Sequence, residues 1–425
     1  MNIQELYKLY IQSYSISTDT RKIHQDSIFF ALKGENFNGN QFAEEALQKG
    51  ASYAIVDEKK YQTKPTIILV DDVLKTLQDL ATYHREKLNV PVIGLTGSNG
   101  KTTTKELMNA VLSTKYNTTA TLGNLNNHIG VPLTLLSMTP ETEMGIVEMG
   151  ANHLREIDFL CSIALPDFGY ITNFGKAHLE GFGSLKGVVQ GKTELYSSLK
   201  ERGKLVFVNA NDSKQLESAE GIRQVTFGSN NADVIVELIE ANPFVIVKFN
   251  SVTVQTKLIG AYNFDNIAAA IAIGMHFQVN DNVIKEAIEN YIPTNNRSQI
   301  IKKGTNTIIL DAYNANPTSM EAALKNISGL TDKNKIAILG DMFELGDDAL
   351  KEHQNIAELV LNLNIDTVYL IGENFYKTTV QDNKIKRYKT FGDFKEYFSE
   401  LQTLESTLLI KGSRGMVLER VLELL

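Results

Sequence analysis

Apolar residues gather in short runs along this chain, and a polar or glycine-rich segment follows most of them. The run at 90–95 precedes a segment, 105–112, whose apolar residues recur at the spacing of one helix face. Continuous apolar runs predict buried strands, and their alternation with helical segments predicts a mostly parallel α/β sheet. The further runs in the middle of the chain lie at 144–148, 168–172, 205–209, 234–238 and 244–249.

The pattern changes at two places. Near residue 295 it restarts, with apolar runs at 308–311, 335–340, 367–371 and 407–410. Before residue 89 the strand-like runs lie at 27–32 and 52–56, beside an amphipathic segment at 41–49. We therefore expect an α/β protein of three domains: a small mixed α/β domain at 1–88, a central parallel-sheet domain at 89–294, and a doubly wound, Rossmann-like domain at 295–425.

Composition excludes several classes of protein. The 425 residues are 43% apolar, which is enough for folded cores, and the net charge of -8 argues against a nucleic-acid partner. The single cysteine, Cys161, lies in an apolar segment, which excludes a disulfide framework and favours a buried thiol. The first residues lack a signal-peptide pattern, and no apolar run approaches the ~20 residues of a membrane span. We expect a cytoplasmic protein.

The segment 92–104 carries the clearest chemistry. Its apolar run leads through three glycines into Lys101 and Thr102, and then into the helical segment. Glycines let a backbone turn tightly and aim N–H groups at anionic oxygens, while a lysine reaches the outer phosphates and a threonine binds Mg2+. The spacing departs from G-x-x-x-x-G-K-[ST], which would put glycine at Leu95. We predict a variant phosphate loop, and the alternative is a glycine-rich turn with a chance Lys-Thr.

Polar residues also follow two neighbouring strand-like runs. Glu148 ends the run at 144–148, and an acid at such a strand end holds the metal in phosphate-loop enzymes. His178 follows the run at 168–172, where a histidine either ligates a metal or forms surface hydrogen bonds. Because the carboxyl ends of parallel strands line one crevice, we expect these groups to converge on the phosphate loop.

Asparagines recur in two further segments. Asn263 and Asn266 stand three residues apart at the start of an Ala/Ile-rich helix, where they either read an adenine edge or cap the helix. The segment 121–132 holds three more, which either present hydrogen-bond groups to a polar ligand or stabilise turns: Asn124, Asn126 and Asn127.

Three other segments carry weaker signals. The polar group at 17–21 either binds a sugar or nucleotide diphosphate or forms a capped turn with a local ion pair, and its residue types favour the turn. Lys192, two residues before Glu194, is typical of a helix surface. The last domain has polar segments at 311–317 and 411–415 but no phosphate loop, so we expect it to close over a nucleotide held by the central domain.

Together these segments resemble those of the Mur ligases, the ATP-dependent amide-forming enzymes of peptidoglycan precursor synthesis, over essentially the whole chain. The phosphate loop, whose glycine spacing the family shares, and Asp311-Ala312-Tyr313-Asn314-Ala315-Asn316-Pro317 are similar to the signatures of the superfamily. The segments 17–21, 31–35, 123–127, 340–346 and 411–415 add to the resemblance. The segment 148–153, Glu-Met-Gly-Ala-Asn-His, resembles the member that joins D-alanyl-D-alanine to UDP-N-acetylmuramoyl-tripeptide.

The resemblance implies ATP and Mg2+ as cofactors, with a role for each candidate residue. The implied Mg2+ ligands are Thr102, Glu148, His178 and Lys192, the last as a carbamate, and catalysis is assigned to Lys101, Lys192, His178 and Glu148. The implied nucleotide contacts are Thr96, Gly97, Ser98, Asn99, Gly100, Lys101, Thr102 and Thr103, with Asn263 and Asn266 at the adenine and Arg297 and Asp311 from the last domain. The implied substrate contacts are Ser17, Asp19, Thr20 and Arg21 at the UDP end, and Asn124, Asn126 and Asn127. The chain departs from the family at Tyr262, where members often have histidine, and at Arg155, where many have glycine.

The implied reaction is a two-step ligation by a monomer. The tripeptide carboxylate attacks the γ-phosphorus of ATP, and the amine of D-alanyl-D-alanine then displaces phosphate from the acyl phosphate. A sister Mur ligase or a folylpolyglutamate-type ligase, adding a different amino acid, is the first alternative. A partner-regulated NTPase without ligation is the second, although the chain lacks the Asn-Lys-x-Asp motif of GTPases. A scaffold without catalysis is disfavoured because every expected phosphate and metal residue type is present.

Overall fold

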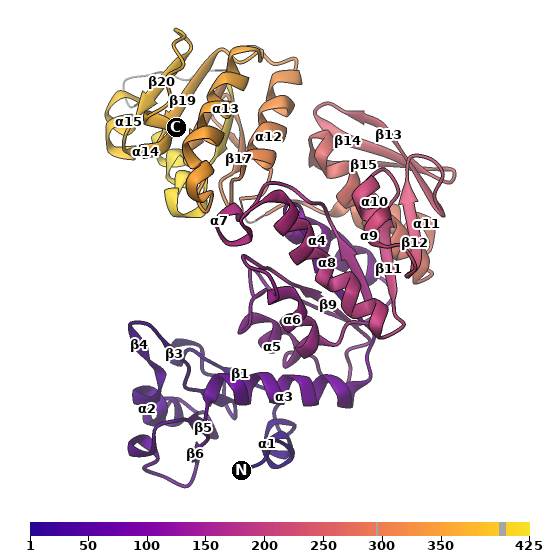
Figure 1. Ribbon diagram of the computed structural model, residues 1–425, viewed down its shortest axis with the longest axis vertical. Helices are drawn as coiled ribbons and strands as arrows, with labels where there is room; N and C mark the ends of the chain where they lie inside the picture. The colour runs from indigo at the N-terminus through magenta and orange to yellow at the C-terminus, as the bar shows by residue number, and fades with distance from the viewer. Residues whose placement is uncertain (295, 399–404) are drawn as a thin grey trace.

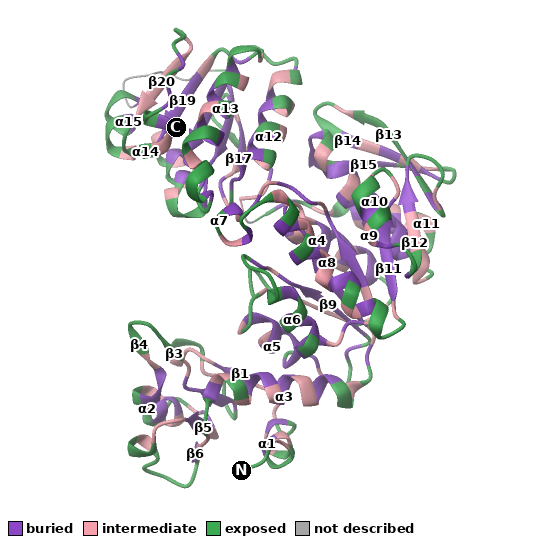
Figure 2. Ribbon diagram, viewed as in Figure 1, coloured by how far each residue is buried: buried purple, intermediate pink, exposed green. Residues whose placement is uncertain are grey.

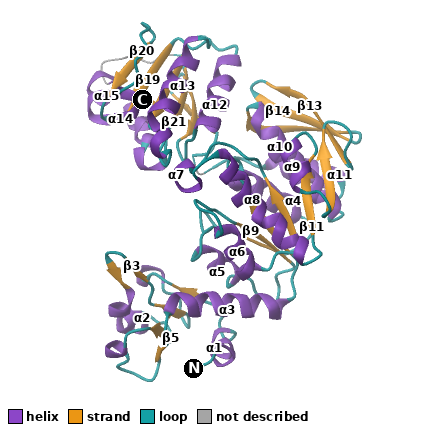
Figure 3. Cartoon of the chain, viewed as in Figure 1, coloured by secondary structure: helices purple, strands orange, loops and turns teal. Residues whose placement is uncertain are grey.

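The computed structural model describes residues 1–294, 296–398 and 405–425. Residue 295, where we expected the last domain to begin, lies outside these ranges. Three large sheets follow one another along the chain, each flanked by helices (Figures 1 and 3), and the described residues also form one two-stranded sheet. The N-terminal and C-terminal domains lie at opposite ends of the long axis, and both join the middle domain (Figure 1). The expected three-domain α/β architecture is confirmed.

The N-terminal domain is a four-stranded parallel sheet in the order β1-β2-β5-β6. The segment 33–39 contains a short antiparallel hairpin between β2 and α2. The strands are β1 (Ile16–Ser17), β2 (Ile28–Phe30), β3 (Lys33–Gly34), β4 (Phe37–Asn38), β5 (Tyr53–Val56) and β6 (Ile67–Leu69), and the helices are α1 (Ile3–Tyr10), α2 (Ala43–Gln48) and α3 (Val73–Leu88).

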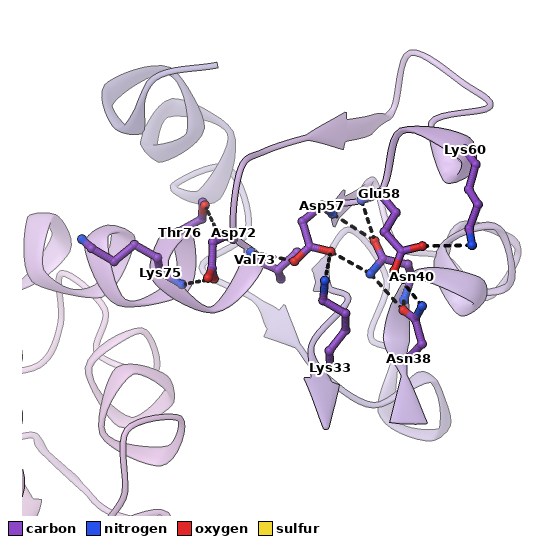
Figure 4. A network of polar contacts seen from close by, with 10 residues as sticks. All are labelled: Lys33, Asn38, Asn40, Asp57, Glu58, Lys60, Asp72, Val73, Lys75 and Thr76. Carbon is purple, nitrogen blue, oxygen red and sulfur yellow. Dashed lines mark hydrogen bonds and ion pairs between the residues drawn. The ribbon is translucent and has the colours of Figure 1, made fainter. Parts of the chain in front are cut away.

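A polar network centred on Asp57 ties the hairpin to the sheet and to α3 (Figure 4). Asn40 is buried, and its Nδ2 donates to Asp57 Oδ1 at 2.9 Å while its Oδ1 accepts from the Asp57 backbone N–H. Lys33 Nζ lies 3.0 Å from the same carboxylate, and the Val73 N–H donates to Asp57 Oδ2 at 3.4 Å. From this anchor α3 runs on to pack against α5 (Gly130–Leu135) and α6 (Glu156–Ala164) of the middle domain.

The middle domain is built on a nine-stranded sheet in the order β15-β14-β13-β12-β11-β10-β7-β9-β8. Pairing is parallel from β8 to β13, and β14 and β15 extend the sheet by antiparallel pairing. The strands are β7 (Val92–Thr96), β8 (Thr118–Ala120), β9 (Met144–Glu148), β10 (Phe168–Ile171), β11 (Leu205–Asn209), β12 (Arg223–Gly228), β13 (Val234–Ala241), β14 (Phe244–Phe249) and β15 (Val252–Ile259).

The central strands of this sheet are buried (Figure 2), because helices cover both of its faces. Ile93 and Leu95 of β7 pack with α4 and α10, while Val92 faces the core beneath α5, α6 and α8. Cys161 is 1% exposed in that second core, as expected, and burial raises the pKa of its thiol to about 12. The remaining helices are α4 (Lys101–Leu112), α7 (Leu179–Phe182), α8 (Leu185–Glu201), α9 (Ser213–Ser218), α10 (Phe264–His276) and α11 (Asp281–Asn290).

The C-terminal domain has a six-stranded sheet in the order β16-β17-β21-β18-β19-β20, parallel except for β16. Its elements are β16 (Gln299–Lys303), β17 (Asn306–Asp311), α12 (Pro317–Gly329), β18 (Lys335–Gly340), α13 (Ala349–Leu361), β19 (Thr367–Ile371), α14 (Glu373–Tyr376), β20 (Ile385–Tyr388), α15 (Phe391–Phe398) and β21 (Thr407–Lys411). In the ranges described above, none of the helices combines the length and apolarity needed to cross a bilayer.

Candidate active site

The phosphate loop joins β7 to α4 and is shaped by two glycines. Gly97 has φ +142°, and a Cβ there would lie 1.9 Å from Thr172 Oγ1. Gly100 caps α4 at φ +80°, and a Cβ there would lie 2.4 Å from Asn266 Oδ1. Because neither position has room for a side chain, the loop lies close against β10 and α10.

Lys101 is the first residue of α4, and its Nζ turns back over the loop. It donates to Gly97 O at 2.7 Å, so the amine lies against the backbone of the loop. Burial lowers the pKa of Lys101 from 10.5, the nearby Arg297 lowers it further, and Glu148 opposes both. Lys105, one turn on, is 3% exposed and donates to Thr121 O at 2.7 Å. Sequence analysis missed Lys105, because a lysine in a helix is ordinarily at the surface.

Glu148 ends β9 beside the loop, as its place after an apolar run predicted. Its side chain is 1% exposed, and Thr102 Oγ1 donates to Oε2 at 3.0 Å while Asn126 Nδ2 donates to Oε1 at 2.8 Å. Both hydrogen-bond partners are uncharged, so neither of them offsets a charge on the carboxyl group. The hydroxyl and carboxylate oxygens are the donor types that Mg2+ prefers.

Lys192 is not the surface residue that its helical context suggested. It is 1% exposed, because Val188, Leu195 and Leu199 place the same face of α8 on the core. Its Nζ donates to Ala151 O at 3.0 Å. Burial and then the charge of Lys101 hold the pKa of Lys192 well below 10.5, which favours the neutral amine.

His178 stands just before α7 at φ +53° and faces the C-terminal domain. Its Nδ1 forms an ion-pair contact with Glu344, and the hydrogen bond from His178 lowers the pKa of that carboxyl. Glu344 also has a positive φ, of 62°, and its carbonyl accepts from the Glu180 N–H at 3.2 Å. Within the described residues, no three His, Cys, Asp or Glu side chains gather into a metal site on their own.

The two helix-start asparagines are buried beside the loop and do not cap α10. Asn263 Nδ2 donates to Ile259 O at 2.8 Å, Asn266 Nδ2 donates to Asn263 Oδ1 at 2.8 Å, and Thr104 Oγ1 donates to Asn266 Oδ1. Asn263 makes no side-chain cap bond. The capping alternative is therefore wrong for Asn263. Both residues border the same cavity as the loop.

From the C-terminal domain, Arg297 and Asp311 reach this cavity. The Arg297 guanidinium stacks 3.9 Å from the centroid of the Tyr313 ring, and its buried Nε has no partner among the described residues. Asp311 forms an ion pair with Lys411 and accepts from the Ser298 N–H at 3.2 Å. Tyr262 shares a 2.8 Å hydrogen bond with Ser298 Oγ.

These groups surround one cavity of about 1150 Å³ between the middle and C-terminal domains. The predicted residues that line it are Ser98, Asn99, Gly100, Lys101, Thr102, Thr103, Asn124, Asn126, Asn127, Glu148, His178, Asn263, Asn266, Arg297 and Asp311. Thr96, Gly97 and Lys192 lie behind this lining; Thr96 Oγ1 donates to Met149 O at 2.8 Å.

The candidate substrate residues divide differently. Asp19 caps the turn Thr20–Lys22 and pairs with Arg21 at 2.7 Å, and the hydrogen bonds from Arg21 lower the pKa of Asp19 to about 2. Ser17 Oγ donates to Asp19 O, so the capped turn expected from the residue types is confirmed, and this group lies in the N-terminal domain, away from the cavity. Asn127 Oδ1 accepts from the Gly130 N–H at 2.9 Å, which also matches a turn-stabilising role.

Comparison with protein families finds three matches that follow one another along the chain. Residues 12–95 match the Mur ligase family catalytic domain, residues 95–274 the Mur ligase middle domain, and residues 296–414 the Mur ligase glutamate ligase domain.

Individual proteins and structures are similar over nearly the whole length. The chain is 36% identical to UDP-N-acetylmuramoyl-tripeptide–D-alanyl-D-alanine ligase of Bacillus subtilis, over 96% of this chain and 92% of that protein. It is 35% identical to the ligase of the same name in Escherichia coli, over 97% and 93%. A crystal structure of MurF from Acinetobacter baumannii superposes with a TM-score of 0.88 at 30% identity, over 99% of this chain and 98% of that one. MurF of Thermotoga maritima, solved with ADP, gives 0.83 at 26% identity, over 96% of each chain.

Proposed function

This chain belongs to the Mur ligase family, and we propose from that premise that it joins D-alanyl-D-alanine to UDP-N-acetylmuramoyl-tripeptide with cleavage of ATP to ADP and phosphate. The observation that carries the proposal is the single cavity in which the phosphate loop of the middle domain faces Arg297 and Asp311 of the C-terminal domain. The expected enzyme class, an ATP-dependent ligase that forms an amide bond, follows from the same family membership.

The chemistry requires two anions to meet. The tripeptide carboxylate attacks the γ-phosphorus of ATP, which breaks the bond to ADP and forms an acyl phosphate. The amine of D-alanyl-D-alanine then attacks the acyl carbon, phosphate leaves, and the amine gives up a proton. Lys101 and the loop N–H groups offset the charge of the triphosphate, and Arg297 adds a cation from the opposite wall.

We further propose Mg2+ as the cofactor, bound by Thr102 and Glu148. The buried carboxylate with two uncharged partners fits a divalent cation, and Mg2+ commonly adds substrate phosphate oxygens to one or two protein carboxylates. Bound there, it would draw charge from the triphosphate. His178, which lines the cavity, and Lys192 are proposed for a second ion; a neutral buried amine is the form that combines with CO2 to give a carbamate and a proton.

We also propose that the adenine binds at Asn263 and Asn266, and that the UDP end binds at the segment 17–21 of the N-terminal domain. All of these groups come from one chain, which fits a monomer. Because ATP and the UDP-linked peptide are cytoplasmic reactants, we place the reaction in the cytoplasm.

The test is ADP release across a matrix of UDP-peptides and amines, with the product identified by mass. We expect release only when UDP-N-acetylmuramoyl-tripeptide and D-alanyl-D-alanine are both present. Another amine or carboxylate giving the product would identify a sister ligase or a folylpolyglutamate-type enzyme. ATP hydrolysis indifferent to both would favour a partner-regulated NTPase.

The Lys101→Ala substitution tests whether the phosphate loop takes part in the reaction that the ADP-release assay measures. Its loss of charge stabilisation should lower turnover at least ~100-fold. Lys115→Ala is the matched control, because Lys115 lies just past the other end of α4 and donates to Phe277 O outside the cavity. Near-normal turnover of Lys101→Ala would remove the phosphate loop from the mechanism.

A further inference from the structure

The side chain of Asn316 joins the C-terminal domain to the phosphate loop. Its Nδ2 donates to Asn99 Oδ1 at 2.7 Å. Asn316 is the N-cap of α12, is 5% exposed, and its own Oδ1 accepts from the Ser319 N–H at 2.9 Å. One buried amide thus starts a helix in one domain and bonds the nucleotide loop of another.

The main chain of Asn99 needs no help from the C-terminal domain. Its N–H donates to Asn173 Oδ1 at 3.1 Å, and its carbonyl accepts from Thr172 Oγ1 at 2.6 Å and from Asn173 Nδ2 at 3.0 Å. All three bonds come from the segment after β10, within the middle domain. The backbone of Asn99 is therefore held by contacts within the middle domain, and the bond to Asn316 is an additional contact that requires both domains.

The first turn of α12 also touches the segment beside the loop. The Lys176 N–H donates to Thr318 Oγ1 at 3.0 Å, and a Cβ on Gly175 would lie 3.3 Å from Thr318. Ser98 Oγ in turn donates to Gly175 O at 2.9 Å. The start of α12 therefore contacts the loop directly through Asn99 and indirectly through Gly175.

We propose that Asn316 is a positioning residue, which couples the approach of the C-terminal domain to the geometry of the phosphate loop. The inference rests on the proposed ligation. Because the middle domain alone shapes the Asn99 backbone, nucleotide binds with or without Asn316. The bond to Asn99 then orders the loop only in the arrangement that brings both substrates together, so its loss lowers kcat more than nucleotide affinity.

Asn316→Ser separates the two jobs of this side chain. Serine is a good N-cap, so α12 keeps its start, but its hydroxyl is too short to reach Asn99. Aspartate is a poorer choice, because a rotated Asn99 amide could donate to the new carboxylate and restore the bond.

Asn242→Ala is the matched control. Asn242 lies between β13 and β14 of the middle domain, and its Nδ2 donates at 3.2 Å to Gly329 O, at the far end of the same helix α12. The Asn242→Ala substitution removes one hydrogen bond between the same two domains and leaves the contacts of the phosphate loop unchanged. Ligation by this control should stay within about twofold of wild type.

The experiment measures kcat, the dissociation constant for ADP, and the melting temperature for each variant. Loss of one hydrogen bond in the closed arrangement should lower kcat of Asn316→Ser about three- to tenfold, with ADP affinity and melting temperature unchanged. In an Asn99→Ala background the same substitution should have no further effect on kcat.

Three results would overturn the inference: a kcat no lower than that of Asn242→Ala, an ADP affinity that falls in step with kcat, or an undiminished effect in the Asn99→Ala background. A wild-type protein that releases ADP but forms no amide product would instead contradict the proposed function, so the two failures are distinguishable.

Discussion

Replacing Lys192 with methionine should make the protein more stable while removing its ligase activity. Lys192 is 1% exposed, and among the described residues its amine has one hydrogen bond, to Ala151 O at 3.0 Å, with the Phe182 ring centroid 5.1 Å away. In the unfolded chain this group is a hydrated ammonium with three donors, so burial with one hydrogen bond leaves most of that hydration unreplaced. Methionine keeps the unbranched apolar stem and discards the amine.

The size of the effect follows from two opposing contributions. Replacing buried ionisable groups by apolar residues of similar volume stabilises proteins by about 1–4 kcal/mol in favourable cases, and the lost bond to Ala151 O costs about 1 kcal/mol. A net gain of roughly 2 kcal/mol would raise the melting temperature by about 4–8 °C for a domain of this size. The gain should grow as pH falls from 10 toward 7. A lysine whose pKa is lowered by folding binds fewer protons in the native state, so wild-type stability declines below 10.5 and the variant escapes that decline.

The assay is thermal unfolding in CO2-depleted buffer with EDTA, which keeps the wild-type amine unmodified. Lys186→Met, on the exposed face of the same helix, is the control and should leave the melting temperature unchanged. Bicarbonate should alter the melting curve of wild type but not of Lys192→Met. The reasoning would be refuted by a Lys192→Met protein that melts below wild type in the depleted buffer, or by one that retains full ligation.

Two further substitutions test other parts of the structure. His353 accepts from the Met342 N–H through Nε2 at 2.9 Å, and burial lowers the pKa of His353 below 6.5, so wild-type stability should be full above pH 6.5 and fall below it. His353→Gln keeps an acceptor but cannot titrate, so it should flatten that fall in urea unfolding between pH 8 and 5.5. An unaltered dependence of stability on pH would contradict the role given to His353. Gly97→Ala, whose Cβ would lie 1.9 Å from Thr172 Oγ1, should abolish ADP binding in a titration. Gly123→Ala, with φ +55° and open space around it, should cost about 1 kcal/mol of stability and leave ADP binding intact. ADP binding by Gly97→Ala would show that the loop tolerates displacement.

The strands and the strand-end polar residues could be predicted from sequence because both depend on local patterns. Continuous apolar runs gave the central strands, and the rule that parallel strands end at one crevice brought Glu148, His178 and the phosphate loop together. The helix α3 was missed, because its segment 73–88 carries many charges and its buried residues pack on elements far along the chain.

Other features could not be predicted from the sequence, because they depend on contacts between distant parts of the chain. The burial of Lys192 depends on which face of α8 meets the core, and the pairing of His178 with Glu344 and of Asn99 with Asn316 depends on how two domains meet. The residues at 17–21 show the reverse case, because their capped turn is local and the residue types alone predicted it.

The helix α3 also determines which pieces of this protein can be made separately. Gln78 donates to His128 O at 3.0 Å, and Arg85 pairs with Asp167 at 2.6 Å. The helix therefore covers α5 and α6 of the middle domain, although it directly follows the N-terminal sheet in the sequence. A recombinant fragment that starts at residue 89 would expose to water the surface of α5 and α6 that α3 covers, and would leave Asp167 without Arg85. A fragment that starts at Asp72 would include α3 together with its N-cap, and is the shorter piece worth expressing.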